Sequence, residues 1–289
     1  MKLSCVVPTL NEEINVKNFL KGYIIQTQKF HELIFVDGNS KDKTREIIKE
    51  YMKSNPEIKL VICNRKGPAA ARNDGINNVT GEYITFFDAD WSFLNKNAIQ
   101  KIYRIIEKKG TYAILVKNLQ KINFRGLRKY IYLKDKNLAF LLIKKEKILR
   151  WDEKLGFGED KNFFKKLKFE YEIIRFDDFE IALSRSQGEM NFNKIIRRYM
   201  WYGRTIPKYL KKTKDWKYGI GYIVYIISII PIFWFIPFLR GFIKGLKELE
   251  YGLDVPFGMG FVEILTAIGT SLGFMQWLVG IKDIGRDVQ

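Results

Sequence analysis

The feature that most constrains the fold is an alternation of two periodicities over the first 120 residues. Short runs rich in β-branched and aromatic residues recur there: 4–9, 32–37, 58–63, 82–88 and 112–117. Segments with a helical spacing of apolar residues lie between them, at 41–54, where Ser40 is a candidate N-cap, and at 96–109. Strands that alternate with helices predict an α/β fold, a mostly parallel sheet flanked by helices on both faces.

Polar side chains follow three of these predicted strands at the point where each strand ends. Thr9 and Glu12 follow the first strand, Asp37 the second, and Asp88 and Asp90 the fourth. Ligands bind beyond the carboxyl ends of parallel strands, so we expect a site at this edge. Two carboxylates two residues apart on an extended strand face one side, and a divalent cation removes their repulsion. Oxygen ligands favour Mg²⁺ or Mn²⁺, although a turn or a cap explains such a pair equally well.

Charge is distributed unevenly along the chain. The formal net charge is +18, but residues 218–289 hold five Lys and Arg against six Asp and Glu. The basic excess therefore belongs to residues 1–217 and suggests an anionic partner, such as nucleic acid, an acidic membrane or a phosphorylated substrate. The two cysteines lie in apolar runs typical of buried strands, so we expect no disulfide framework and a reducing, cytosolic setting.

Two long apolar stretches lie near the C-terminus. Residues 219–239 carry no charge, and a helix of that length extends roughly 30 Å, the thickness of a bilayer core. Residues 255–281 contain one acid, Glu263, and glycines that would allow close helix packing. Residues 193–217 hold nine Lys and Arg and one Asp among aromatic residues, which predicts a basic amphipathic helix at a membrane interface. Buried helices of a soluble core are the alternative.

These features predict three parts along the chain. We expect a catalytic α/β domain over residues 1–192, an interface helix over 193–217, and a membrane region of about two transmembrane helices over 218–289. Basic residues before a span favour the cytoplasmic side. The protein is therefore expected to be a multi-pass protein of the cell membrane with its α/β domain on the cytoplasmic side.

Five segments, in order, resemble the motifs of the family 2 glycosyltransferases, which have the GT-A fold: VVPTLNEE (6–13), FVDGNSKDKT (35–44), GPAAARNDGI (67–76), FFDAD (86–90) and GFGEDKNFFKKL (156–167). The resemblance covers about residues 3–185. It implies a Rossmann-like GT-A domain that uses a nucleoside-diphosphate sugar and a divalent metal, Mg²⁺ or Mn²⁺. Relatives in this family include dolichyl-phosphate sugar synthases and lipid-linked glycan glycosyltransferases.

The resemblance implies contacts to the donor nucleotide from five residues: Thr9, Glu12, Asp37, Arg72 and Asp88. Asp90 would bind the metal directly, and Asp88 would reach either the metal or the ribose. Arg72 would neutralise a phosphate or contact the base. The alternatives are that Thr9 and Glu12 begin a helix as cap and first-turn acid, and that Arg72 is an exposed helix arginine.

The resemblance also implies an acceptor side. Asp160 matches the base that takes a proton from the incoming hydroxyl in an inverting transfer, and Glu159 would orient or tune it. The alternative is an acid pair favoured by a helix dipole. The sequence lacks the Gln-x-x-Arg-Trp motif of processive members, which argues against a polysaccharide synthase. Arg198 and Arg204 are candidate contacts for the diphosphate, unless they belong to a basic membrane-surface helix.

Three functions remain open on the sequence alone. The first is an inverting, metal-dependent glycosyltransferase that acts on a lipid-linked or membrane-proximal hydroxyl. The second transfers a sugar to a polyprenyl (dolichyl) phosphate, which needs no base, so the Glu159–Asp160 pair argues mildly against it. The third is a non-enzymatic basic protein that binds a membrane or nucleic acid. The basic cluster adjoins an apolar stretch, which favours a lipid surface over nucleic acid.

Overall fold

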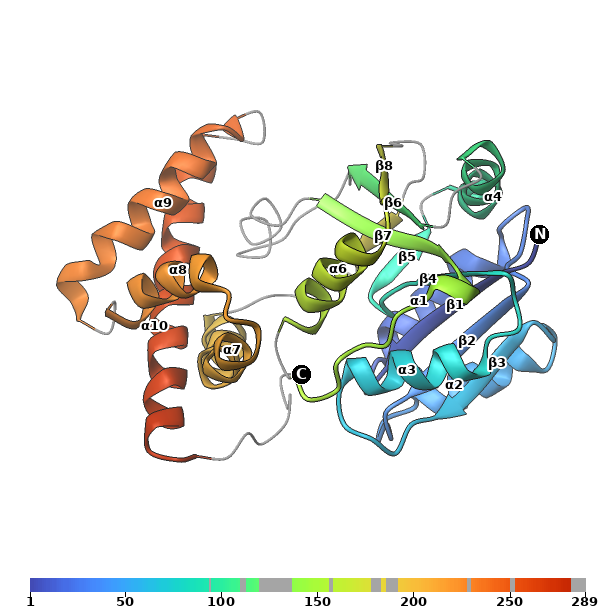
Figure 1. The fold of residues 1–289 in the computed structure, drawn as a ribbon, viewed down its shortest axis with the longest axis horizontal. Coiled ribbons are helices and arrows are strands. Elements are labelled where there is room, and N and C mark those ends of the chain that lie inside the picture. Colours follow the sequence, from blue (N-terminus) through green and yellow to red (C-terminus); the bar gives the residue numbers. More distant parts are fainter. Residues whose placement is uncertain are drawn as a thin grey trace. The chain divides into compact units, whose positions relative to one another are not determined.

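Figure 1 shows the fold of the chain in a computed structural model. The structure describes residues 1–93, 95–109, 113–119, 137–155, 158–177, 183–185, 192–227, 230–249 and 253–281. The chain consists of two compact units. The first comprises Met1–Ile122, Asn137–Lys154 and Glu159–Ser186, and the second comprises Asn123–Lys136, Leu155–Gly158 and Gln187–Gln289.

The first unit is built on a seven-stranded sheet of order β3-β2-β1-β4-β7-β6-β8. Its strands are β1 (Leu3–Thr9), β2 (Glu32–Asp37), β3 (Ile58–Ile62), β4 (Tyr83–Phe86), β6 (Ala113–Leu119), β7 (Asn137–Lys144) and β8 (Ile174–Asp177). β7 runs antiparallel to β4 and β6, and the other four pairings are parallel. β5 (Trp91–Phe93) and β9 (Leu183–Arg185) form a separate antiparallel pair. The predicted mostly parallel sheet is confirmed.

Helices cover both faces of the sheet, as expected (Figure 1). The helices of the first unit are α1 (Glu13–Ile24), α2 (Thr44–Met52), α3 (Pro68–Asn78), α4 (Ala98–Lys109), α6 (Glu159–Glu170) and the 3₁₀ turn η1 (Lys145–Lys147). Successive side chains of β1 point to opposite faces because a strand has a period of two. Cys5 and Val7 join a core with α1, α2 and α4, whereas Val6 joins a core with α3 and α6.

Two local expectations at the sheet edge are wrong. The predicted strand 82–88 ends at Phe86, and Asp88 and Asp90 lie in the turn before β5, where Trp91 N donates to Asp88 O at 3.1 Å. A turn, rather than the pleat of a strand, therefore sets the directions of the two carboxylates. Ser40 does not cap a helix, because α2 begins only at Thr44.

The second unit contains a group of helices. These are α7 (Phe192–Thr213), α8 (Trp216–Ile227), the 3₁₀ turn η2 (Pro231–Trp234), α9 (Phe235–Leu246) and α10 (Val255–Leu278). α10 contacts α7, α8 and α9. A Cβ at Gly273 or Gly269 would overlap α7, and one at Gly260 would overlap Phe238 of α9. Glycine thus permits the close helix packing that the sequence predicted.

The apolar stretch 219–239 is not one continuous helix. It is divided among α8, η2 and α9, with residues 228 and 229 outside the described part of the chain. Pro231 begins η2, where its missing N–H and fixed φ interrupt an α-helix. Within the described residues, one helix, α10, is long and apolar enough to cross a membrane, and most of its apolar window is buried. The two-span arrangement stays a prediction.

Candidate functional site

The carboxyl ends of three strands meet at one edge of the sheet in the first unit. β1 lies between β2 and β4 and is parallel to both. Thr9 pairs in register with Asp37, and Phe86, the last residue of β4, pairs with Val6 of β1. The loops that carry the predicted donor-site residues therefore leave the sheet side by side.

Asp37 is fixed in place by its own loop. The side chain is fully buried, and it accepts hydrogen bonds from the backbone N–H groups of Asn39 (3.1 Å) and Ser40 (2.8 Å). The Ser40 hydroxyl donates to Asp37 Oδ2 at 2.5 Å, and the Thr9 hydroxyl lies 3.4 Å from the same oxygen. Arg45 Nε is 3.9 Å from Oδ1. This carboxylate is held in one geometry without any ligand.

Glu12 stands where the loop after β1 meets the loop after β2. Its backbone N–H donates to Thr44 Oγ1 at 2.8 Å, and its carboxylate accepts a hydrogen bond from Asn15. Burial raises the pKa of Glu12, the Asn15 bond opposes that shift, and the negative charges of Asp90 and Asp88 add to it. Glu12 precedes α1 without a side-chain cap bond, so capping does not explain it. Three carboxylates thus share one electrostatic environment.

Arg72 connects the turn after β4 with the start of α6. Its Nη2 lies 3.1 Å from Asp88 Oδ1, and its Nη1 lies 3.6 Å from Glu159 Oε1. The guanidinium lies over the Trp151 ring, 4.5 Å from its centroid. Only 12% of the Arg72 side chain is exposed, so the alternative of a solvent-facing helix arginine is wrong.

Two residues that the sequence did not single out support Arg72. Trp151 stacks on Phe163 of α6, with ring centroids 4.0 Å apart. Asn73 clamps the Trp151 backbone: its amide donates to the Trp151 oxygen at 3.0 Å, and its oxygen accepts from the Trp151 N–H at 2.9 Å. Asn73 belongs to the GPAAARNDGI motif, which was a signal for it, whereas no motif marks Trp151.

The predicted acceptor-side pair begins α6. Glu159 and Asp160 occupy its first turn, where the helix dipole favours acids. Glu159 turns toward Arg72, as given above, whereas Asp160 is exposed and accepts a hydrogen bond from the Lys161 N–H at 2.7 Å. Residues 156 and 157 of the same motif lie outside the described residues.

Arg198 and Arg204, the candidate diphosphate contacts, belong to α7 in the second unit. Arg204 is half-buried, and its Nη1 donates to Gln276 Oε1 of α10 at 2.6 Å. That bond joins two helices of the second unit and gives Arg204 a structural partner. Their role toward a diphosphate stays a prediction.

The carboxylates of Asp88 and Asp90 fit a divalent-cation site that a bound ligand completes. Asp88 and Asp90 present two carboxylates in one turn, next to Glu12. Among the described residues, no group of three His, Cys, Asp or Glu side chains forms a metal site. Mg²⁺-type sites often use one or two carboxylates and take the remaining oxygens from substrate phosphates and water. The residues present fit that kind of site.

A family model for glycosyl transferase family 2 matches residues 4–183. A glucosyltransferase of Campylobacter jejuni, named as acting on GalNAc(5)-diNAcBac-PP-undecaprenol, is 25% identical over 75% of this chain and 78% of its own length. The glycosyltransferase GlyA of Streptococcus pneumoniae is 32% identical over 39% of this chain, but the match spans only 16% of that protein.

A solved structure extends the likeness to both units. The mannosyltransferase PcManGT from Pyrobaculum calidifontis, in complex with GDP-Man and Mn²⁺, covers 97% of this chain and 88% of its own, with a TM-score of 0.62 and 17% identity. At this identity the likeness concerns the fold, which is the GT-A fold.

Proposed function

The chain belongs to glycosyltransferase family 2, and from that premise we propose that it is a metal-dependent, inverting enzyme. It moves a sugar from a nucleoside-diphosphate donor to a lipid-linked or membrane-proximal hydroxyl. The observation that carries the proposal is the convergence of Asp37, Arg72 and Asp88 at one sheet edge. Strand ends in open α/β sheets are where such folds bind their ligands.

Each residue of the donor site has a task that its surroundings permit. Asp37, held rigid by its loop, accepts hydrogen bonds from the ribose or base of the nucleotide. Arg72 offers a guanidinium that neutralises a phosphate when the donor enters. Asp88 and Asp90 would hold a divalent cation, which would supply Lewis-acid stabilisation of the departing diphosphate. The GDP-Man and Mn²⁺ bound to PcManGT support this assignment of ligand class.

The acceptor side of the site rests on α6. Asp160 is exposed, so an incoming hydroxyl can reach it, and it takes the proton from that hydroxyl. Glu159 is held by Arg72 and orients the acceptor relative to the donor. Asp160 and the departing diphosphate must lie on opposite faces of the anomeric carbon, because an inverting attack occurs opposite the leaving group.

The composition of the chain and one relative support a lipid-linked acceptor. The Campylobacter jejuni protein is named for a substrate linked to undecaprenol through a diphosphate. The second unit exposes many large apolar side chains on α8, η2, α9 and α10, as expected for helices beside a lipid phase. We include in the proposal that the enzyme is attached to the cell membrane by this unit, with the first unit on the cytoplasmic side.

Sugar transfer by the purified full chain in detergent tests the proposal. The protein is supplied with Mn²⁺, a panel of nucleoside-diphosphate sugars and a polyprenyl-diphosphate-linked glycan, and the released nucleoside diphosphate is measured. We expect one donor to be consumed only in the presence of acceptor and metal. Asp160→Asn should lower the rate at least a hundredfold, because general-base catalysis contributes about 10²–10⁴. Glu170→Gln, an exposed acid at the other end of α6, is the matched control.

The second candidate function is transfer to a polyprenyl phosphate. A phosphate acceptor is already anionic and needs no base. The exposed position of Asp160 is therefore compatible with this function as well. If Asp160→Asn retains its rate with polyprenyl phosphate as acceptor, that function replaces the first. If the chain turns over no nucleotide sugar with either acceptor, both are wrong.

A further inference from the structure

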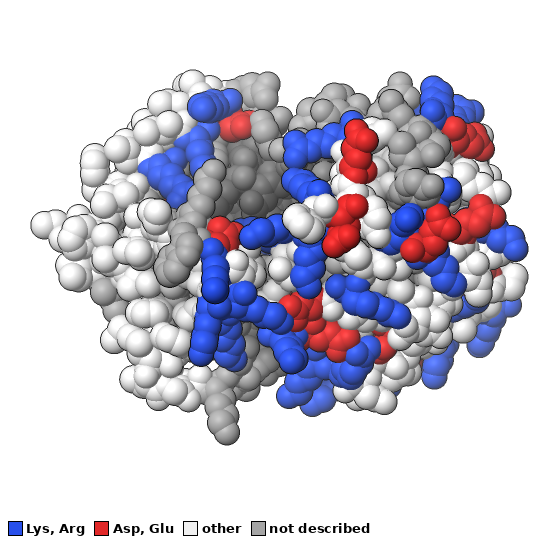
Figure 2. All heavy atoms as spheres, in the orientation of Figure 1, with Lys and Arg blue, Asp and Glu red and all other residues white. Residues whose placement is uncertain are grey.

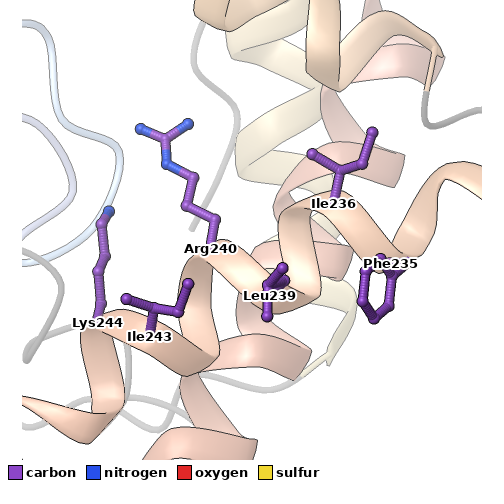
Figure 3. A pocket seen from close by; sticks show the side chains of 6 residues that line it. All are labelled: Phe235, Ile236, Leu239, Arg240, Ile243 and Lys244. Carbon is purple, nitrogen blue, oxygen red and sulfur yellow. The ribbon is translucent and has the colours of Figure 1, made fainter.

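α9 carries two basic side chains inside an apolar surface. A shallow, open surface of about 480 Å³ lies along one face of this helix, which we call the α9 groove; it is lined by Phe235, Ile236, Leu239, Arg240, Ile243 and Lys244. Figure 3 shows Arg240 and Lys244 extending from the same side of the helix, one turn apart. Its four apolar residues are all exposed, from 40% for Leu239 to 67% for Phe235. Isolated exposed apolar residues are ordinary, whereas a continuous row beside two cations needs a partner.

The length of α9 suits a helix that lies at the surface of a bilayer rather than one that crosses it. With 12 residues the helix extends roughly 18 Å, well short of the roughly 30 Å that a span requires. A short helix with apolar and basic residues lies in the interface, with its charges among the lipid headgroups. Figure 2 shows mostly uncharged side chains over α8 and α9 on the face that it draws. The residues that line the surface with the two cations are otherwise apolar.

A buried acid contacts Lys244 directly and Arg240 through Tyr225. Glu263 of α10 is 1% exposed, and its carboxylate accepts hydrogen bonds from Tyr225 (2.8 Å) and Lys244 (3.4 Å). Arg240 donates to the Tyr225 hydroxyl at 3.2 Å and lies 5.7 Å from the centroid of that ring. Three helices thus fix the positions of the basic groups. One formal negative charge faces two positive ones, so the cluster keeps a net charge of +1.

We propose that Arg240 and Lys244 bind the phosphate of an anionic glycerophospholipid, whose acyl chain lies in the α9 groove. A lipid phosphate carries the single negative charge that complements the cluster, and its oxygens accept the hydrogen bonds that guanidinium and ammonium groups donate. The apolar residues of the groove match the beginning of the acyl chain. This site rests on the membrane attachment included in the proposed function, and it goes beyond that function because its ligand is neither the sugar donor nor the acceptor.

Lipid binding to the full chain tests the site. Protein in a neutral detergent is titrated with phosphatidylglycerol or phosphatidylcholine, and bound lipid is counted by native mass spectrometry. Arg240→Gln combined with Lys244→Gln should weaken phosphatidylglycerol binding about thirtyfold, because each basic group near a lipid surface contributes about a fivefold factor. Phosphatidylcholine binding should not change.

The matched control removes two positive charges elsewhere in the second unit. Lys211→Gln combined with Lys212→Gln alters two exposed residues near the end of α7, so it lowers net charge equally without touching the groove. Equal losses in both double variants would mean bulk electrostatic attraction and would overturn the proposal. Full binding by the Arg240 and Lys244 variant, or displacement of phosphatidylglycerol by an equimolar polyprenyl diphosphate, would overturn it as well.

A second measurement on the unaltered chain covers the case in which the double variant fails to fold. Phosphatidylglycerol with a photoactivatable group near its phosphate is crosslinked to the protein in mixed micelles, and the labelled peptides are identified. We expect the label within residues 235–246. A label distributed evenly over the helices of the second unit, or confined to α7, contradicts the site. Neither measurement depends on nucleotide binding, so the outcome is independent of the proposed donor site.

Discussion

Arg72 is the residue on which the two sides of the candidate site depend. Its guanidinium lies between Asp88 and Glu159 and stacks on the ring of Trp151. A lysine could supply the charge, but it could not donate to both acids while stacking on a ring. One planar side chain therefore couples the electrostatics of Asp88, on the proposed donor side, with those of Glu159, on the proposed acceptor side.

The support from Trp151 can be measured by replacing its ring. Trp151→Leu removes the aromatic face below Arg72, and we expect kcat/KM for the donor to fall about tenfold, since a desolvated cation–π contact contributes about 1–2 kcal/mol. Trp151→Phe keeps an aromatic face and should retain most of the activity. Equal losses in the two variants, at equal melting temperatures, would contradict the role of the ring.

Glu32 makes the stability of the folded state depend on pH, and the direction of that dependence can be predicted. It is 1% exposed, and although burial raises its pKa, hydrogen bonds from Lys59, Ser4 and Thr80 outweigh burial and lower the pKa from 4.5 to about 2. A carboxylate whose pKa is lowered on folding stabilises the folded state at pH values above its pKa in the unfolded state. This contribution is lost as the pH falls through the pKa of the folded state. Glu32 therefore stabilises the sheet fully above about pH 4.5 and not at all below about pH 2.

Glu32→Gln should remove that contribution. We expect a loss of about 2 kcal/mol at pH 7, because a buried charge-assisted network is replaced by neutral bonds. The difference from the unaltered protein should shrink as the pH falls from 4.5 toward 2, as followed by thermal unfolding at a series of pH values. Glu46→Gln, an exposed acid of α2, serves as control and should change little. A difference that grows toward acidic pH would show that the sign is wrong.

The contacts of a residue were harder to predict than its place on the sheet. Asp37 and Thr9 were found at the strand ends because strand periodicity and parallel order determine which residues meet there. Trp151 was missed because its contact with Arg72 joins residues 79 positions apart, and no local pattern encodes such a pair. Ser40 was misassigned to a helix cap because its hydroxyl binds Asp37 instead.

At the scale of elements, the helices of the second unit are packed through glycines. A Cβ on Gly273 would overlap the Met200 carbonyl of α7, and one on Gly241 would overlap the Met259 carbonyl of α10. Neither backbone atom can move without shifting a helix. These glycines therefore set the separation of the helix axes, as small residues do in membrane helix pairs.

Gly273→Ala should lower the melting temperature of the protein in detergent. Forcing a methyl group into a close-packed contact costs about 1–3 kcal/mol, and here the neighbour is backbone. Gly219→Ala in α8 is the matched control, because its Cβ would meet only the Leu210 side chain at an ordinary 3.7 Å. Alanine favours a helix more than glycine does, so this control should be neutral or stabilising. Equal melting temperatures for the two variants would contradict the packing.

The elements of the first unit were predicted better than those of the second. Alternating β-rich and helical segments have a distinct period, and the strands at 4–9, 32–37 and 58–63 lie within one residue of the prediction. The apolar run 219–239 has no internal period that marks its break, so the sequence alone suggested one helix where η2 and α9 follow α8. Pro231 indicated an interruption, but a proline occurs both in a kinked continuous helix and at a break between two helices, so it does not distinguish them.

At the scale of the whole molecule, the chain joins an α/β unit of glycosyltransferase family 2 with an apolar helical unit. The basic excess lies in residues 1–217, whereas the exposed apolar helices lie in the second unit. That division suits an enzyme that binds anionic donors and stays beside a lipid phase. The proposed phospholipid site on α9 would add a specific lipid contact to the proposed membrane attachment of the second unit.

We propose that the turn after β4 forms a metal-dependent donor site, and calorimetric titration with a nucleoside diphosphate measures that dependence. We expect the full chain to bind GDP or UDP with Mn²⁺ and at least tenfold more weakly with EDTA. Asp90→Asn should abolish the effect of the metal. Asp74→Asn, a control in which Arg65 keeps its partner Glu153, should not change it. Equal affinity with and without Mn²⁺, or a full metal effect in Asp90→Asn, would show that the turn after β4 is not a metal-dependent donor site.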